Sequence, residues 1–149
     1  MTDDHTLTVL AVDHVGIAVP DLDAAIAFHC GAFGLAVMHR EVNQEQGVAE
    51  AMLAPPHSPP GATALQLLAP LTPESTIASF IGRSGPGLQQ LAYRVADVEA
   101  AASALRASGV RLLYDSAKVG TGGSLINFAH PKDTGGVLIE LVQPADPAH

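Results

Sequence analysis

Basic residues are scarce in this chain. Its 149 residues include seven lysines and arginines against 15 aspartates and glutamates, which gives a formal net charge of -8. Proteins that bind the phosphates of nucleic acids or an anionic membrane surface need a basic face. The composition therefore argues against both as partners. A small anionic ligand remains compatible with it, because Arg106, Arg111, Lys118 and Lys132 fall within one stretch of the chain.

Cysteines and long apolar runs are also lacking. Cys30 is the single cysteine, so the chain forms no internal disulfide, as is usual in reducing compartments. No apolar run approaches the roughly 18 residues of a membrane-spanning helix, and residues 1–14 lack the basic start of a signal peptide. These absences favour a cytoplasmic protein. The 48% of hydrophobic residues is enough for a packed core.

The chain contains an internal repeat. "GLQQLAYRVADVEAA", residues 87–101, resembles "VDHVGIAVPDLDAAI", residues 12–26. In the alignment Val19 lies over Val95, Asp21 over Asp97, and His14 over Gln90. The repeat is too long for a solenoid and occurs only twice, so it indicates duplication of one module.

Each copy predicts the order β-α-β-β-β. An alternating strand passes through an acidic cap into a helix, and three further strands follow. The predicted strands cover 10–19, 35–42, 47–55 and 62–70 in the first copy and 88–95, 110–117, 124–131 and 137–144 in the second, with helices over 21–33 and 97–108. We therefore predict an α+β fold in a single domain, 1–149. Module one spans 8–70, module two spans 86–144, and the connector 71–85 carries a short helix with Pro73, Glu74 and Ser75 in its first turn.

Polar residues occupy equivalent strand positions in the two copies. His14 aligns with Gln90, and Gln66 in "ALQLLAP" aligns with Glu140 in "VLIELVQP". On the first strand His14 shares a face with Gly16 and Ala18, which leaves open space, while the bulky alternate residues face the helix. A glutamate inside an apolar strand is costly unless it is paired, protonated or bound to a metal.

Two interpretations of these four residues stay open. If the modules pair around a pseudo-twofold axis, His14, Gln66, Gln90 and Glu140 converge on a divalent metal, and such an oxygen-rich set suits Mn, Mg, Co or Ni better than structural zinc. Alternatively, the two glutamines only hydrogen-bond neighbouring strands and His14 is a core histidine. Histidines without a repeat counterpart are predicted to lie on the surface: His5, His39, His57 and His149.

The sequence resembles the vicinal oxygen chelate superfamily and, within it, the methylmalonyl-CoA epimerases. The motif "DHVGIAV" is typical of the superfamily, and "EQGVAEAML" together with "HPKDTGGVLIEL" is typical of the epimerases. The resemblance implies a cupped sheet of paired modules around one divalent metal ion per chain, usually in a homodimer. It implies an isomerase that interconverts the 2R and 2S forms of methylmalonyl-CoA, in propionyl-CoA metabolism.

The resemblance also implies roles for single residues. The metal ligands of the family fall on His14, Gln66 and Glu140, and the fourth falls on Gln90, where the family commonly has histidine. Glu50 takes the position of the family's base, although Glu45 is a close competitor in "QEQGVAEAM". Removal of hydrogen from one face of C2 and its return on the other requires a second acid, for which Glu140 is the candidate.

Substrate binding is expected in the second module. Lys118, the glycines Gly120, Gly122 and Gly123 of "GTGG", and Lys132 are the candidates for contact with the acyl-CoA. Glycines let a backbone approach a ligand closely, although such a run is often just a flexible loop. Leu125 stands where related sequences commonly carry arginine, which removes a positive charge that could meet an anionic substrate.

Three functions remain open from the sequence. The first is the epimerase. The second keeps the fold but changes the reaction, to a glyoxalase-type lyase or isomerase or to a dioxygenase; a dioxygenase is expected to hold iron with two histidines and a carboxylate, and here one histidine occupies a ligand position. The third is a protein without catalytic activity that binds a small ligand.

Overall fold

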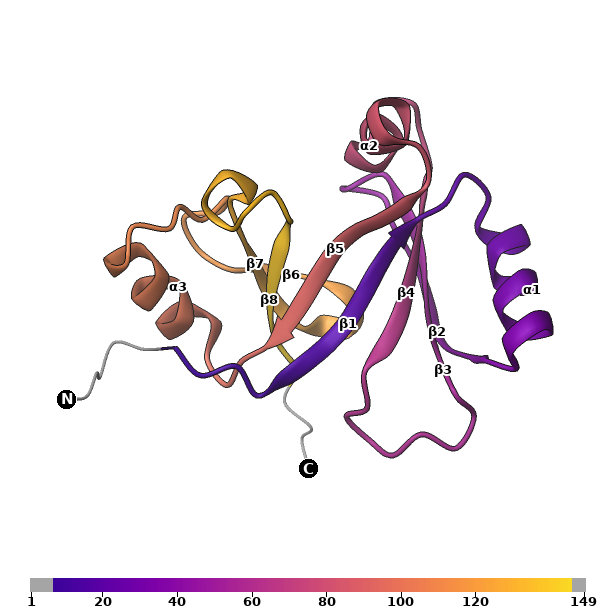
Figure 1. Cartoon of the computed structure of the whole chain (residues 1–149), viewed down its shortest axis with the longest axis horizontal. Helices are drawn as coiled ribbons and strands as arrows, with labels where there is room; N and C mark the ends of the chain where they lie inside the picture. Colours follow the sequence, from indigo (N-terminus) through magenta and orange to yellow (C-terminus); the bar gives the residue numbers. More distant parts are fainter. Residues whose placement is uncertain (1–6, 146–149) are drawn as a thin grey trace. The chain divides into compact units, whose positions relative to one another are not determined.

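A computed structural model describes residues 7–145 of the chain (Figure 1). The elements follow in this order: β1 (Ala11–Ala18), α1 (Leu22–Phe33), β2 (Ala36–Asn43), β3 (Val48–Ala54), β4 (Ala64–Pro70), α2 (Thr76–Ser84), β5 (Gly87–Arg94), α3 (Val98–Ala107), β6 (Lys118–Val119), the 3-10 turn η1 (Thr121–Gly123), β7 (Leu125–Ala129), the 3-10 turn η2 (Pro131–Asp133) and β8 (Ile139–Gln143). Within the described residues, every helix is too short or too polar to cross a membrane.

The described residues form two compact units. The first unit comprises residues 14–89, and the second comprises residues 7–13 together with 90–145. Neighbouring strands follow the order β2-β3-β4-β1 in the first unit and β5-β8-β7-β6 in the second. In each unit one pair is parallel, β1 with β4 and β5 with β8, and the remaining pairs are antiparallel. The two units therefore repeat one strand arrangement, as the internal repeat predicts.

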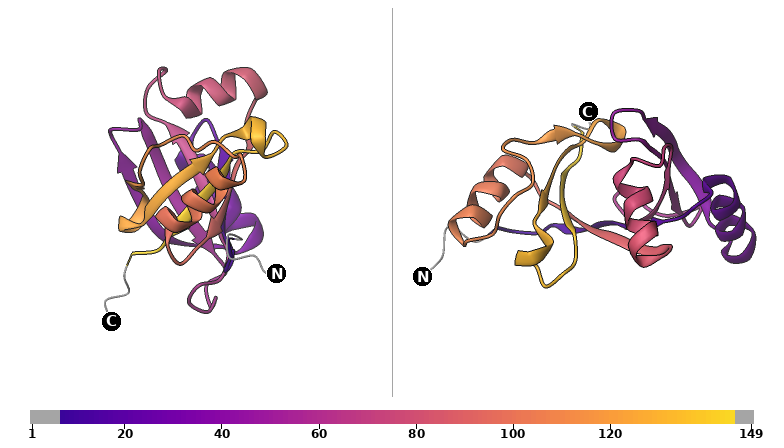
Figure 2. Two further views of the ribbon diagram at one scale, coloured as in Figure 1. Left: turned by 90° about the vertical axis from the view of Figure 1, so that its left-hand side faces the viewer. Right: turned by 90° about the horizontal axis from the view of Figure 1, so that it is seen from above.

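Helix α1 covers one face of the first unit (Figure 2). Asp21 caps its start, because the Asp21 carboxylate accepts a hydrogen bond from the Ala24 amide at 3.0 Å. Gly34 ends it in the left-handed conformation, at φ 72°. Ile17 and Val19 pack with α1 in the core of this unit, as the alternation of the first strand predicts. Burial of this apolar face holds the helix on the sheet.

Helix α2 covers part of the opposite face. Its first residue is Thr76 and Ser75 is its N-cap, accepting from the Ala78 amide at 3.0 Å, so the predicted first turn at Pro73–Ser75 lies one turn too early. Ala18 is fully buried in a cluster with Val48, Leu68 and Ile77. The face that carries His14 is therefore packed at its Ala18 end, and the expectation of open space along all of it was wrong there.

Helix α3 packs against β7 and β8 of the second unit. Asp97 caps its start by accepting from the Ala100 amide at 3.0 Å. The Val98 amide donates to the side-chain oxygen of Gln143 in β8, also at 3.0 Å. Val98 and Leu141 are buried in the core of this unit. The helix of the second copy, α3, thus begins at the predicted acidic cap and is hydrogen-bonded directly to the last strand, β8.

The strand predicted over 110–117 is absent. Only Leu112 forms a bridge there, with Ala129, and the short strand β6 begins later, at Lys118. The reason is a fully buried side chain, Asn127. Its Oδ1 accepts from the Tyr114 amide at 3.1 Å, and its Nδ2 donates to the Tyr114 carbonyl at 3.0 Å. These bonds satisfy backbone groups of Tyr114 that a neighbouring strand would otherwise have to pair.

Asn127→Ala is expected to lower the free energy of unfolding by about 2–4 kcal/mol, because it leaves buried backbone groups without partners. Urea denaturation measures this. The matched control is Asn43→Ala. The Asn43 side chain accepts one exposed hydrogen bond, from the Gln46 amide, so its removal is expected to lower the free energy of unfolding by less than about 1 kcal/mol. Equal losses in the two variants would contradict the role given to Asn127.

Candidate functional site

Three of the predicted site residues share one face of the first unit. His14 lies on β1, Gln66 on β4 and Glu50 on β3. The β1–β4 register pairs Gly16 with Gln66, and the β3–β4 register pairs Glu50 with Leu68. Because paired residues point to the same side of a sheet and alternate residues share a face, all three side chains project from the face opposite α1.

These three side chains are deeply buried. The exposed fraction is 3% for His14, 3% for Gln66 and 5% for Glu50. Gln66 Nε2 donates a hydrogen bond of 2.6 Å to Glu50 Oε1. A hydrogen bond of this length is short for an N–H donor, and it fixes the orientation of the carboxylate. The first unit therefore holds a buried, oriented carboxylate on the sheet face that also carries His14, with β4 between their two strands.

The second unit contains a related pair. Gln90 on β5 and Glu140 on β8 have exposed fractions of 7% and 6%, and Gln90 Nε2 donates to Glu140 Oε1 at 2.7 Å. The β5–β8 register pairs Ala92 with Glu140, so Gln90 and Glu140 share a face. Each glutamine thus donates a hydrogen bond to a carboxylate on a neighbouring strand, Gln66 to Glu50 and Gln90 to Glu140.

The two amide–carboxylate pairs are not equivalent in the repeat. Gln66 aligns with Glu140, so the amide and the acid exchange places between the two units. In the first unit, Glu50 lies opposite Leu68, which is two residues beyond Gln66 on β4. At the corresponding place in the second unit, Ile126 lies opposite Val142, which is two residues beyond Glu140 on β8. Ile126 is therefore the counterpart of Glu50. The duplication supplies one carboxylate at this position, in the first unit alone.

Glu45 does not compete with Glu50 as a buried base. It lies exposed in the turn between β2 and β3, whereas Glu50 is buried in β3 itself. His39 and His57 are exposed as predicted, and His5 and His149 lie outside the described residues. Within residues 7–145, no three His, Cys, Asp or Glu side chains gather as a metal-binding group. The predicted ligand set includes two glutamines, which lie outside those residue types.

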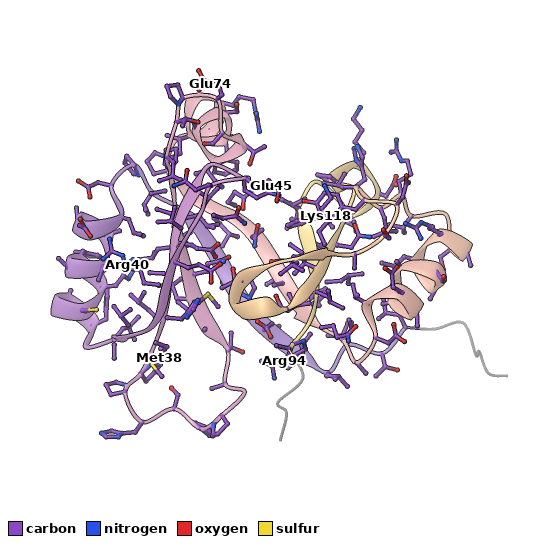
Figure 3. All side chains as sticks on the ribbon, turned by 180° about the vertical axis from the view of Figure 1, so that it is seen from behind. Met38, Arg40, Glu45, Glu74, Arg94 and Lys118 are labelled. Atoms are coloured by element: carbon purple, nitrogen blue, oxygen red, sulfur yellow. The ribbon has the colours of Figure 1, made fainter. Side chains whose placement is uncertain are left out.

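The predicted substrate-binding residues flank β7 in the second unit. Lys118 lies on β6, labelled in Figure 3, with its Nζ 4.3 Å from the centre of the Tyr114 ring. Gly120 begins the turn between β6 and β7, where a side chain would meet Ile126 Cγ2 at 2.8 Å. Gly122 and Gly123 follow with φ of 66° and 83°. Lys118 and these glycines therefore lie at one end of β7.

Lys132 lies at the other end of β7, in η2. Its amide donates to His130 Nδ1 at 3.1 Å. The structure thus separates Lys132 from the glycine turn by the length of β7. The same loop is anchored by Asp133, whose carboxylate accepts from Nε of Arg111 at 2.9 Å, from its Nη2 at 3.1 Å and from its backbone amide at 2.9 Å. Sequence reasoning did not find this anchor, because Arg111 and Asp133 belong to different segments.

The family assignment follows from comparison with known proteins. Residues 13–128 match the family model of the Glyoxalase/Bleomycin resistance protein/Dioxygenase superfamily. The chain belongs to this superfamily, which confirms the resemblance to vicinal oxygen chelate proteins and the predicted fold class of paired β-α-β-β-β modules.

Its relatives include methylmalonyl-CoA epimerases. The mitochondrial enzyme of Homo sapiens is 36% identical over 133 residues, which are 89% of this chain and 73% of the human protein. The crystal structure of the Mycobacterium tuberculosis epimerase is 52% identical, with a TM-score of 0.89, and the match covers 96% of this chain and 93% of that one. A variant of the Streptomyces coelicolor epimerase in complex with 2-nitronate-propionyl-CoA is 47% identical, with a TM-score of 0.87 over 93% of this chain and 96% of that one.

The anchor at Asp133 predicts a pH dependence. The hydrogen bonds from Arg111 lower the pKa of Asp133 to about 2. Because this pKa lies below the ordinary value of about 3.9, the anchor stabilises the loop fully above about pH 4 and is lost as the pH falls toward 2. A carboxyl-carbon NMR titration of Asp133 is expected to show this depressed midpoint.

Arg111→Gln is expected to return the Asp133 midpoint toward the ordinary value, because it removes the two guanidinium hydrogen bonds. Arg106→Gln is the matched control, since Arg106 donates to the carbonyls of Tyr114 and Asp115 instead. An ordinary midpoint in the unaltered protein would contradict the account of the anchor.

Proposed function

We propose that this chain is a methylmalonyl-CoA epimerase, which interconverts (2R)- and (2S)-methylmalonyl-CoA through an enolate. The observation that carries the proposal is the Glu50 carboxylate, which is 5% exposed and accepts a 2.6 Å hydrogen bond from Gln66. Relatives that match most of this chain are named methylmalonyl-CoA epimerases. They support the assignment of an isomerase, and the buried carboxylate supplies the base that this reaction needs.

The substrate explains why one carboxylate suffices as base. The C2 hydrogen of methylmalonyl-CoA lies between a thioester and a carboxylate, so its removal gives an enolate with charge on the thioester oxygen. A base of moderate strength, held close to C2, removes such a hydrogen. Burial excludes water from Glu50, and the Gln66 amide fixes the plane of its carboxylate. These features orient Glu50 for proton abstraction.

The second acid of the reaction is Glu140 in this proposal. Epimerisation returns hydrogen to the face of C2 opposite the one it left, so a group other than Glu50 donates it. Glu140 is the buried carboxylate of the second unit and is held by Gln90, as Glu50 is held by Gln66. Because each buried glutamate accepts a hydrogen bond from a glutamine, the arrangement supports Glu50 and Glu140 as the two acid–base groups of the reaction.

His14, Gln66, Gln90 and Glu140 are the proposed ligands of one divalent metal ion, with Co, Mn, Mg and Ni as candidates. The donor atoms of these four side chains suit such an ion. Each glutamine donates through Nε2 to a carboxylate, so the atom that it offers a cation is its carbonyl oxygen. One imidazole nitrogen with amide and carboxylate oxygens is a set that such ions accept. A bound ion would supply a positive charge that polarises the thioester oxygen.

An acyl-CoA is the proposed substrate class, in keeping with the CoA ligand of the Streptomyces coelicolor structure. Lys118, Gly120, Gly122, Gly123 and Lys132 are the proposed contacts. Gly120 acts through the turn that it permits, because a side chain there would strike Ile126. Leu125, at the position where the family resemblance leads us to expect arginine, packs against the core of the second unit. Lys118 is therefore the cation on this side of the turn that would meet the anionic substrate.

A homodimer and a cytoplasmic location remain predictions. The dimer comes from the resemblance to the family, and the location comes from the sequence. Sedimentation of the purified chain measures the first, and fractionation of the cells that make it measures the second.

Glu50→Gln is expected to lower the rate of epimerisation by about 10²–10⁴-fold, because glutamine keeps the shape of the side chain but cannot accept the proton. A coupled assay that consumes one epimer measures the rate. Glu45→Gln is the matched control, because Glu45 lies in an exposed turn, and it is expected to keep the rate of the unaltered enzyme. Retained activity in Glu50→Gln would remove Glu50 from the mechanism.

Gln90→Ala is expected to weaken binding of the divalent ion by about tenfold or more, because it removes an oxygen ligand and the hydrogen bond that orients Glu140. Calorimetric titration with Co²⁺ or Mn²⁺ measures the affinity. Gln89→Ala is the control, since Gln89 alternates to the other side of the strand and its buried Oε1 makes no hydrogen bond. If Gln90→Ala binds as tightly as the unaltered chain, the site has three ligands.

A further inference from the structure

Two titratable side chains on β2 share the face of Glu50. In the β2–β3 register Glu41 lies directly opposite Glu50, and His39 lies opposite Met52. Residues directly opposite in an antiparallel pair point to the same side, with Cβ atoms about 4.5–5.5 Å apart. The carboxylate of Glu41 is therefore the cross-strand neighbour of the proposed base.

A β-bulge creates this arrangement. Val37 lies opposite Leu53, but the register shifts before His39, which lies opposite Met52. Without the shift, Arg40 rather than Glu41 would stand opposite Glu50. Bulges redirect side chains in this way and are common beside active sites.

Arg40 points to the opposite side of β2, toward α1 (Figure 3), where its Nη2 lies 2.6 Å from Asp23 Oδ1. An arginine opposite Glu50 would be a fixed charge, because a guanidinium does not release its proton in proteins. The bulge instead places beside Glu50 a carboxylate, which exchanges protons readily.

Exposure rises along the three groups. Glu50 is 5% exposed, the Glu41 side chain is 29% exposed and that of His39 is 45% exposed. His39 Nε2 lies 2.6 Å from Glu41 Oε1. Carboxylates and imidazoles both accept and release protons near neutral pH or below it. The series therefore leads from a buried carboxylate, through its cross-strand neighbour Glu41, to a solvent-exposed imidazole that contacts Glu41.

We propose that Glu41 and His39 form a proton relay between Glu50 and solvent. The inference rests on the proposed function. If Glu50 removes hydrogen from one face of C2 and another group returns it to the other face, Glu50 ends the turnover protonated. It must lose that proton before it acts again in the same direction, and its burial limits direct exchange with water.

The steps balance in protons and charge. The carboxylic acid of Glu50 gives its proton to the Glu41 carboxylate, so an O–H bond breaks at Glu50 and one forms at Glu41. Glu41 then passes the proton to Nε2 of the neutral His39 imidazole. The resulting imidazolium releases its other proton, from Nδ1, to water. The same steps in reverse supply a proton to Glu50 when the reaction runs in the opposite direction.

The second unit has no such series at the equivalent positions. There Lys118 lies opposite Ile126, in the places that Glu41 and Glu50 occupy in the first unit. Duplication alone therefore does not account for Glu41 beside Glu50. The relay belongs to the module that carries the base.

The test is steady-state kinetics of the full-length, metal-loaded enzyme with methylmalonyl-CoA. Glu41→Gln keeps the size of the side chain but cannot pass a proton, and we expect kcat about tenfold lower with KM changed by less than about twofold. Added imidazole buffer is expected to restore kcat in Glu41→Gln, because a small diffusible base replaces a relay group. A purely structural role predicts no such rescue.

His39→Gln is the second variant and is expected to show the same fall in kcat and the same rescue. Glu45→Gln, the same substitution in the adjacent turn, is the matched control and should show neither. Thermal unfolding midpoints check that all three variants fold.

Folded Glu41→Gln and His39→Gln enzymes with the kcat of the unaltered enzyme would overturn the relay, and so would a fall in kcat that imidazole does not restore. Both results leave the epimerase itself in place. An unaltered, metal-loaded enzyme without epimerase activity would instead overturn the proposed function, and the relay with it.

Discussion

The hydrogen bond from the Gln66 amide to the Glu50 carboxylate, 2.6 Å long and buried, is the interaction on which the proposed chemistry depends. A carboxylate in an apolar sheet is stable only where a donor compensates its lost hydration. Gln66 meets that need while its carbonyl oxygen serves as a metal ligand in the proposed site. One side chain thus links the base to the ion, and both positions follow from the registers of β4 with β1 and β3.

Duplication explains the scaffold, and its departures from symmetry explain the chemistry. Both units carry a helix on one face and a buried amide–carboxylate pair. At the positions of Glu50 and Glu41, however, the second unit has Ile126 and Lys118. At these two positions the first unit therefore carries carboxylates, while the second carries an apolar side chain and a cation.

Much of the fold is predictable from sequence because it depends on local signals. The two-residue alternation placed His14 and Gln66 on their strands, and Asp21 and Asp97 marked both helix starts. Long-range contacts account for the failures. Asn127 takes the backbone hydrogen bonds of Tyr114 and so replaces a predicted strand. The partners of the two glutamines, and the bulge that brings Glu41 opposite Glu50, depend on strand register, which the residues of one strand do not encode. The role of Glu50 came from the family resemblance, because the repeat gives it no counterpart.

The most direct test of the account is proton NMR of methylmalonyl-CoA incubated with the metal-loaded enzyme in D₂O. We expect deuterium to replace the C2 hydrogen, so that the methyl doublet collapses to a singlet, and we expect removal of the metal by a chelator to stop the exchange. A methyl doublet that persists with folded, metal-loaded enzyme would contradict it.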